Sequence, residues 1–283
     1  MENNHGPEAI IERLAERLIR VRGVKAVVLG GSRARGTHHP GSDIDIGIYY
    51  DGEAGPDGAE LNRLAAEWDD SGRTGLVTEV GEWGPWINGG GWLQVDGIPV
   101  DLLLRDLSKV EQVVEDGLNG RVTIDYQPGH PHGFVNTIYM AEIACCRVLQ
   151  DPEGRIAALK ARTDPYPEAL REGTVRKFLW EASFAQANAL KSVGKNDPAY
   201  LAGCCFRAVA CLNQALFALN GRYLMNEKGA TIEADGLKIA IPGYRDAVAR
   251  LFASLSSGEA EILRALGELE RLVQEAERLV GAP

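Results

Sequence analysis

The chain has 283 residues, of which 45% are hydrophobic and 25% are charged, and its formal net charge at pH 7 is −10. Such a composition is typical of a globular protein, and this length can bury one large or two ordinary hydrophobic cores. The charge disfavours nucleic acid as a partner, because polynucleotide binding relies on Lys and Arg to neutralise phosphates. No stretch predicts a membrane span and the N-terminus lacks the basic and apolar regions of a signal peptide, so we expect no membrane association and a cytoplasmic location.

The first predicted elements are a helix at residues 8–20 and a strand at residues 24–29. The helix places apolar side chains on one face, and the strand is a short β-branched run closed by two glycines. These patterns predict a buried strand in a sheet that the helix covers.

The turn after this strand has the composition of a phosphate-binding loop. Gly30 and Gly31 let the backbone come close to an anion. Ser32 follows at the start of a short predicted helix, where free backbone N–H groups and the positive end of the helix dipole favour phosphate. Arg33 and Arg35 add positive charge nearby, although an arginine in a polar loop is often only solvated. We therefore expect this turn to bind a nucleotide phosphate.

The next predicted strand carries two carboxylates on one face. Apolar and other residues alternate from Asp43 to Tyr49, so Asp43 and Asp45 project together while the isoleucines project into a core. Two aspartates this close repel each other unless a cation lies between them. Hard oxygen ligands beside a triphosphate select Mg²⁺. The pattern therefore predicts a magnesium site at the start of this strand.

Further elements complete an α/β unit: a helix at 57–68, strands at 76–80, 92–95 and 98–104, a helix at 107–116 and a strand at 121–125. Asp101 is the single acid among the apolar residues of its strand, and an unpaired carboxylate there would be costly to bury. A metal would remove that cost, which makes Asp101 the candidate third ligand. Glu79 would reach the same site, as a ligand or as a general base, if its strand lies antiparallel to that of Asp101. A solvated strand end is the alternative for Glu79.

Three tryptophans lie in or beside a glycine-rich loop at residues 81–91. Trp83, Trp86 and Trp92 could stack on a base or a sugar. Tryptophans near strand ends also commonly seal a core, so both interpretations stay open.

The Gly-Gly-Ser turn, the Asp-x-Asp strand and a later strand aspartate, in this order, resemble the polymerase-beta-like nucleotidyltransferase superfamily, especially its small bacterial branch that includes the aminoglycoside nucleotidyltransferases. The resemblance implies a mixed sheet flanked by helices, with Ser32 on the triphosphate and Asp43, Asp45 and Asp101 as ligands of two Mg²⁺ ions. ATP or another NTP would be the donor. Two metal ions would activate the attacking hydroxyl and neutralise the leaving pyrophosphate.

The second half of the chain is predicted to be helical, which gives an α+β fold class. The expected helices span residues 136–149, 151–162, 167–193, 198–220, 244–255 and 258–280. We therefore divide the chain into a nucleotidyltransferase domain at 1–130 and a helical bundle at 131–283. The resemblance implies that this bundle selects the acceptor.

Several charged residues of the helical half have open roles. Glu181 and Arg207 lie among small or apolar neighbours, where an unpaired charge is expensive, so we expect them to pair. Lys228 could reach triphosphate oxygens, with structural pairing or capping as the alternative. Glu142 and Glu181 join Glu79 as candidate general bases, and no motif chooses among the three.

The sequence leaves two classes of function. The favoured one is Mg²⁺-dependent transfer of a nucleoside monophosphate from ATP or another NTP to a hydroxyl of a small molecule, with release of pyrophosphate. An acidic cleft would attract a cationic, aminoglycoside-like acceptor. The alternative is a nucleotide-binding, antitoxin-like or partner-binding module whose catalysis is incidental. Three metal carboxylates favour the enzyme, and a homo-oligomer stays open in either case.

Overall fold

The computed structural model describes residues 6–52, 55–195, 197–256 and 258–281, which fold into two compact units. The first unit comprises the chain up to Glu115 together with Asp125–Gly129 and Tyr139–Asp164. The second comprises Asp116–Ile124, His130–Ile138 and the chain from Pro165 onward. The chain therefore passes between the units several times, whereas the sequence suggested a single division near residue 130.

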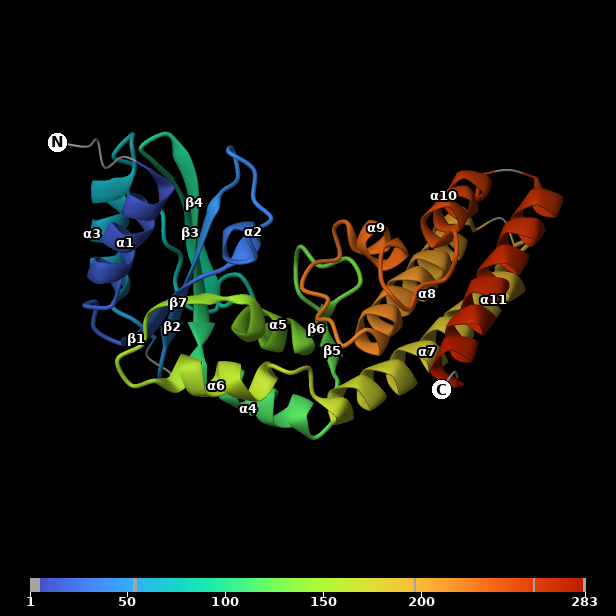
Figure 1. Cartoon of the computed structure of the whole chain (residues 1–283). Helices are drawn as coiled ribbons and strands as arrows, with labels where there is room; N and C mark the ends of the chain where they lie inside the picture. Colours follow the sequence, from blue (N-terminus) through green and yellow to red (C-terminus); the bar gives the residue numbers. More distant parts are fainter. Residues whose placement is uncertain (1–5, 53–54, 196, 257, 282–283) are drawn as a thin grey trace. The chain divides into compact units, whose positions relative to one another are not determined.

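A five-stranded mixed sheet forms the centre of the first unit, with the strand order β3-β4-β2-β1-β7 (Figure 1). The strands are β1 (Val24–Leu29), β2 (Ile44–Tyr50), β3 (Gly89–Val95), β4 (Ile98–Asp106) and β7 (Arg147–Gln150). The central pair β2 and β4 is parallel, and the other neighbours are antiparallel. The predicted mixed sheet is confirmed.

Two helices, α1 (Pro7–Leu18) and α3 (Gly58–Trp68), lie side by side on one face of this sheet (Figure 1). Their apolar faces bury residues such as Leu14 and Leu61 against the alternate strand residues Ile44, Ile46 and Leu102. Asp57 caps the N-terminus of α3, because its carboxylate accepts a hydrogen bond of 3.1 Å from the backbone N–H of Glu60. The isoleucines of β2 are thus anchored in the core, as the alternation predicts.

The helix α5 (Thr137–Cys145) packs against residues of the opposite face. There the buried guanidinium of Arg105 donates two hydrogen bonds, of 2.8 and 2.7 Å, to the carboxylate of Glu142. Two further helices, α4 (Leu107–Leu118) and α6 (Arg155–Thr163), are joined by hydrogen bonds from Arg155 to Glu111. Residues 139–164 thus supply both an edge strand and helices to the first unit.

Three local expectations are corrected. The helix predicted over residues 136–149 ends at Cys145, and Arg147–Gln150 instead pairs with β1 as the edge strand β7. The strand predicted at 76–80 is reduced to one isolated bridge between Val77 and Gly91 of β3. The strand predicted at 121–125 shortens to β5 (Ile124–Asp125), which pairs with β6 (Phe134–Val135).

The second unit is helical, as predicted. Its helices include α7 (Glu168–Ser192), α8 (Pro198–Leu219), α9 (Ala230–Asp235), α10 (Tyr244–Ser254) and α11 (Glu259–Gly281). The helices α7 and α8 pack along each other, and α10 and α11 complete the bundle (Figure 1). The core contains the fully buried side chains of Phe178, Leu212, Tyr244 and Leu269.

The helix α8 is long and apolar enough to cross a membrane, judged by length and composition alone. The sequence was expected to contain no such stretch, so this expectation is corrected. However, 72% of that stretch is buried inside the structure. Packing within the helical core therefore accounts for its apolar composition.

Candidate active site

Two of the three predicted aspartates are register partners at the centre of the sheet. Asp45 of β2 pairs with Asp101 of the parallel strand β4, and neighbouring strands lie about 4.8 Å apart. Both side chains point to the face opposite the isoleucine core, because side chains alternate along a strand. Asp43 immediately precedes β2 and is exposed. The sheet thus brings together two carboxylates that are far apart in the sequence, with a third at the strand entrance.

The environment of these aspartates resists the accumulation of negative charge. Burial, reinforced by the charges of Asp45 and Asp43, raises the pKa of Asp101 to about 6. Burial and then the charge of Asp43 also raise the pKa of Asp45, whereas Arg35 and Arg33 partly oppose that rise. A cation placed among the carboxylates would reverse both effects.

The donor set fits a hard divalent cation in its chemistry. Carboxylate oxygens are the ligands that Mg²⁺ prefers. Burial and neighbouring carboxylates raise the pKa of both Asp45 and Asp101, so a bound cation would stabilise their charged forms. Within the described part of the chain, no three His, Cys, Asp or Glu residues are already gathered closely enough to hold a metal ion. The site therefore offers suitable ligands without a preassembled cage.

The glycine turn packs directly against Asp45. The backbone N–H of Gly30 donates a hydrogen bond of 2.8 Å to the carbonyl oxygen of Asp45. Gly31 has φ +59°, and a Cβ atom built on it would lie 1.7 Å from Oδ2 of Asp45. Only glycine fits this position without displacing the carboxylate. Ser32 follows, half-buried, in the short helix α2 (Gly31–Ala34), as predicted.

The two arginines of the turn differ in what they contact. The guanidinium of Arg33 donates hydrogen bonds of 2.9 Å to the carbonyl oxygen of Asp43 and 2.5 Å to that of Ser42. It therefore holds the segment that leads into β2. Arg35 is exposed and, among the described residues, donates one long hydrogen bond of 3.4 Å, to the carbonyl oxygen of Gly31. Arg35 is the better placed of the two for an anionic ligand.

Comparison with known proteins now adds to this geometry. Residues 9–122 match the family profile described as a nucleotidyltransferase domain. This segment is a nucleotidyltransferase domain. The match confirms the expected polymerase-beta-like superfamily and the enzyme class, a nucleotidyltransferase, whereas the aminoglycoside branch stays a prediction.

The match for the second half of the chain indicates no function. Residues 135–228 match a domain of unknown function, DUF4037. One similar solved structure is that of a nucleotidyltransferase-like protein from Exiguobacterium sibiricum, with 12% sequence identity and a TM-score of 0.48 over 96% of this chain and 77% of that chain. A likeness this low transfers no detail of the site. No curated protein matches the chain.

Glu79 lies apart from the aspartates of the nucleotidyltransferase domain. Val77, two residues before Glu79, bridges to β3 rather than to β4. The Val77 side chain is buried in the isoleucine core. A Cβ atom built on Gly58, at the start of α3, would lie 3.7 Å from the Glu79 carboxylate. Glu79 therefore points toward the helix-covered face, and the expectation that it joins the metal site is corrected.

The other two glutamates considered as bases are already engaged by arginines. Glu142 accepts both hydrogen bonds from Arg105, and Glu181 accepts one of 2.5 Å from Nε of Arg207. The predicted pair of Glu181 and Arg207 is thus confirmed. Pairing accounts for the position of each glutamate without a role in catalysis.

Lys228 belongs to the second unit. It is exposed in the loop between α8 and α9, where its backbone N–H donates a hydrogen bond of 2.9 Å to Oδ1 of Asn226. Its contact with triphosphate oxygens stays a prediction.

The tryptophan that flanks the aspartates is Trp92, not Trp86. Trp92 is the register partner of Asp101, so the two side chains share a face, and it is 60% exposed while stacking on Trp83 at 4.5 Å between ring centroids. Trp86 is 8% exposed and packs edge-on against Tyr139. Sequence reasoning missed the position of Trp92 beside Asp101. The Asp96-Gly97 hairpin turn, with φ +50° and +77°, sets this register and was the available signal.

Proposed function

We propose that this chain is a Mg²⁺-dependent nucleotidyltransferase that moves a nucleoside monophosphate from ATP or another NTP to a hydroxyl group of a small molecule. The observation that carries the proposal is the register pair of Asp45 and Asp101, with the glycine turn packed directly against the Asp45 carboxylate. This arrangement supports a triphosphate site beside paired metal ligands. The nucleotidyltransferase profile over residues 9–122 supports the class of reaction.

The residues of the site would bind the metal ions and the triphosphate. Asp43, Asp45 and Asp101 would hold two Mg²⁺ ions, which supply Lewis acidity at the phosphates and activate the acceptor hydroxyl. The rigid sheet would keep the two strand carboxylates in place. Ser32, together with the backbone N–H groups that follow Gly31, would contact the triphosphate. Exposed Arg35 would add positive charge near the phosphates.

The reaction joins the acceptor oxygen to the α-phosphorus of the NTP. The bond between the α-phosphorus and the oxygen that bridges to the β-phosphate breaks, so pyrophosphate leaves, and the hydroxyl proton passes to solvent or to a base. Glu142 and Glu181 are already paired with arginines, so we assign no side chain to that base.

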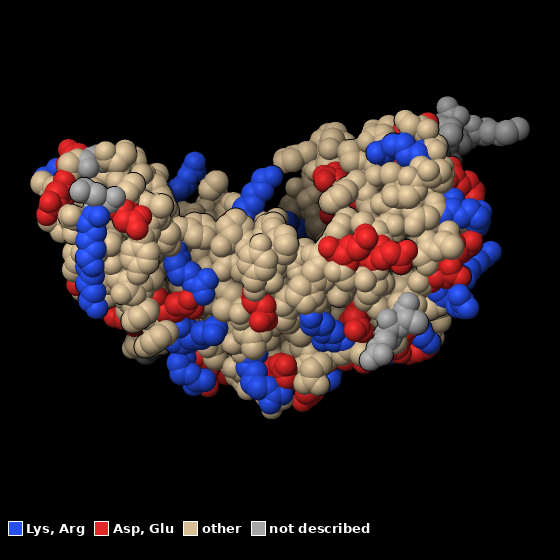
Figure 2. Space-filling view, turned by 180° about the vertical axis from the view of Figure 1, so that it is seen from behind, with Lys and Arg blue, Asp and Glu red and all other residues tan. Residues whose placement is uncertain are grey.

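Charge favours a small acceptor over a nucleic acid. On the face shown in Figure 2, Lys and Arg atoms are interspersed with Asp and Glu atoms. The formal net charge of −10 adds to the acidity of the aspartate site. A cationic hydroxylated molecule, such as an aminoglycoside, would be attracted to such a surface. The exposed ring of Trp92 would stack on a ring of the acceptor or on the base of the nucleotide. We also retain the cytoplasmic location as a prediction.

Pyrophosphate release tests the proposal. Each NTP is incubated with Mg²⁺ and a panel of aminoglycosides and other hydroxylated small molecules. We expect pyrophosphate release that requires an acceptor. It should disappear in Asp43→Asn and persist in the exposed control variant Asp164→Asn. Nucleotide binding without release for any acceptor would instead indicate a nucleotide-binding partner module.

A further inference from the structure

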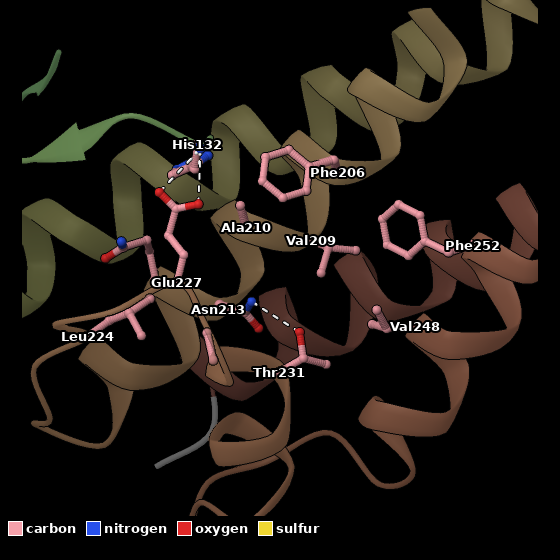
Figure 3. A pocket seen from close by; sticks show the side chains of 12 residues that line it. His132, Phe206, Val209, Ala210, Asn213, Leu224, Glu227, Thr231, Val248 and Phe252 are labelled. Atoms are coloured by element: carbon pink, nitrogen blue, oxygen red, sulfur yellow. Dashed lines mark hydrogen bonds between the residues drawn. The ribbon is translucent and has the colours of Figure 1, made fainter. Parts of the chain in front are cut away.

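A separate cavity of about 190 Å³ lies within the helical second unit (Figure 3). Its walls are mainly apolar and come from α8, α10 and the loop before α9, and they include Phe206, Val209, Leu224, Val248 and Phe252. An apolar cavity of about 150 Å³ is large enough to bind benzene. The cavity therefore has room for a single ring or a short branched chain, but not for an oligosaccharide.

One end of the cavity contains a buried histidine with unsatisfied hydrogen-bonding groups. His132 is 4% exposed, and neither Nδ1 nor Nε2 has a hydrogen-bond partner among the residues that the structure describes. Buried polar atoms are nearly always paired, so an unpaired imidazole beside a cavity indicates a missing partner. Both nitrogens are shielded from solvent, but a half-turn of the ring exchanges its nitrogen and carbon positions. His132 can therefore present a nitrogen to the cavity without backbone movement.

A carboxylate lies at the same end. Both oxygens of Glu227 accept the backbone N–H of His132, at 3.2 and 3.0 Å, and Figure 3 shows the carboxylate pointing toward His132. Burial raises the pKa of Glu227, which shows that its negative charge is poorly solvated. The nearby guanidinium of Arg207 is committed to Glu181 and to the carbonyl oxygen of His132. Nδ1 of His130 lies 3.9 Å from Oε1 of Glu227, a contact that is an ion pair only when His130 is protonated.

Two other polar side chains of the cavity, Asn213 and Thr231, are hydrogen-bonded within the helical unit. The amide nitrogen of Asn213 donates to Thr231 at 3.4 Å, and its oxygen accepts from the hydroxyl of Tyr244 at 2.9 Å. At the end formed by His132 and Glu227, the missing partner is therefore a hydrogen-bond donor with positive charge.

We propose that this cavity binds a small, mainly apolar molecule that carries a protonated primary amine. The ammonium group donates hydrogen bonds to Glu227 and to the unprotonated nitrogen of His132, and the apolar body lies among Phe206, Val209 and Phe252. Much of the α8 lining falls within residues 135–228, so the site gives the domain of unknown function a role in ligand binding. Binding at this site does not depend on nucleotidyl transfer.

Benzylamine, benzyl alcohol and benzoate form a matched set of probes, because they share a ring and differ in charge. Calorimetric titration of the full chain is expected to show binding of benzylamine, with benzyl alcohol at least about tenfold weaker and benzoate undetected. Equal binding of the amine and the alcohol, stronger binding of benzoate, or no binding of benzylamine at millimolar concentration would overturn the proposal.

Variants locate the site. Glu227→Gln keeps an oxygen that accepts the His132 N–H but removes the charge, and it should weaken benzylamine at least about tenfold. The exposed control variant Glu233→Gln on α9 should bind normally. Ala210→Leu should fill the cavity and abolish binding while circular dichroism stays unchanged. Asp45→Asn should retain full benzylamine binding, which separates this site from the nucleotidyltransferase site. Unchanged affinity in both Glu227→Gln and Ala210→Leu would refute the assignment.

Discussion

Replacement of Gly31 by alanine provides a sharp test of the active-site geometry. An alanine at φ +59° carries a backbone cost of about 1–2 kcal/mol. Its methyl group would also lie 1.7 Å from Oδ2 of Asp45, so the carboxylate would have to move by more than 1 Å to restore van der Waals contact. A displacement of about 1 Å at a reacting centre can cost roughly 100-fold in rate. We therefore expect Gly31→Ala to lose at least about 100-fold in kcat/KM while it remains folded.

Gly72 provides the matched control. It has φ +61°, nearly that of Gly31, but a Cβ atom there would have no neighbour within 4 Å among the described residues. Gly72→Ala should therefore show a similar loss of stability in urea denaturation and nearly normal kcat/KM. The reasoning would be refuted if the two variants lost activity equally, or if Gly31→Ala retained the activity of the unmodified chain.

Three further predictions follow from particular contacts. Trp92→Ala should raise KM for the nucleotide or the acceptor about 10-fold with little change in stability, because the exposed ring is available for stacking; an unchanged KM for both would exclude this role. Arg105→Met should destabilise the first unit by about 3–5 kcal/mol in urea denaturation, because it leaves Glu142 unpaired. The double variant with Glu142→Leu should recover much of that loss, and no recovery would contradict the pairing. Burial, reinforced by the charge of Arg207, lowers the pKa of His132 to about 4, so between pH 6.5 and 4 the unfolded chain binds a proton at this residue that the folded chain does not, and stability is lost as the pH falls through that range. In urea denaturation between pH 7 and 4.5, His132→Gln should avoid roughly 2 kcal/mol of that loss. The control His39→Gln should avoid none of it.

Elements with strong local signals were predictable from the sequence. The strand β1 was predicted with its observed bounds, because a β-branched run ends at two glycines. The helix α3 was predicted within a residue or two, because Asp57 caps an amphipathic stretch. The same alternation that placed Ile44 and Ile46 in the core also placed Asp45 on the open face. These features depend on neighbours in the sequence, which is why they could be recognised.

The features that were missed depend on contacts between distant segments. The strand β7 is short and half-buried, and only its pairing with β1 distinguishes it from the end of the preceding helix. The departure of Glu79 from the aspartates follows from the pairing of Val77 with β3, which no local pattern specifies. The burial of Arg105 is explained by Glu142, a partner 37 residues away. The cavity beside His132 likewise depends on helices that meet only after folding.

Product analysis tests the central claim most directly. The chain is incubated with ATP, Mg²⁺ and an acceptor that supports pyrophosphate release, and the products are identified by mass spectrometry. The proposed reaction predicts an acceptor that has gained one nucleoside monophosphate, with an equal amount of pyrophosphate, and no adduct from Asp101→Asn. A phosphorylated acceptor with ADP, or ATP hydrolysis that persists unchanged in Asp101→Asn, would contradict nucleotidyl transfer at this site.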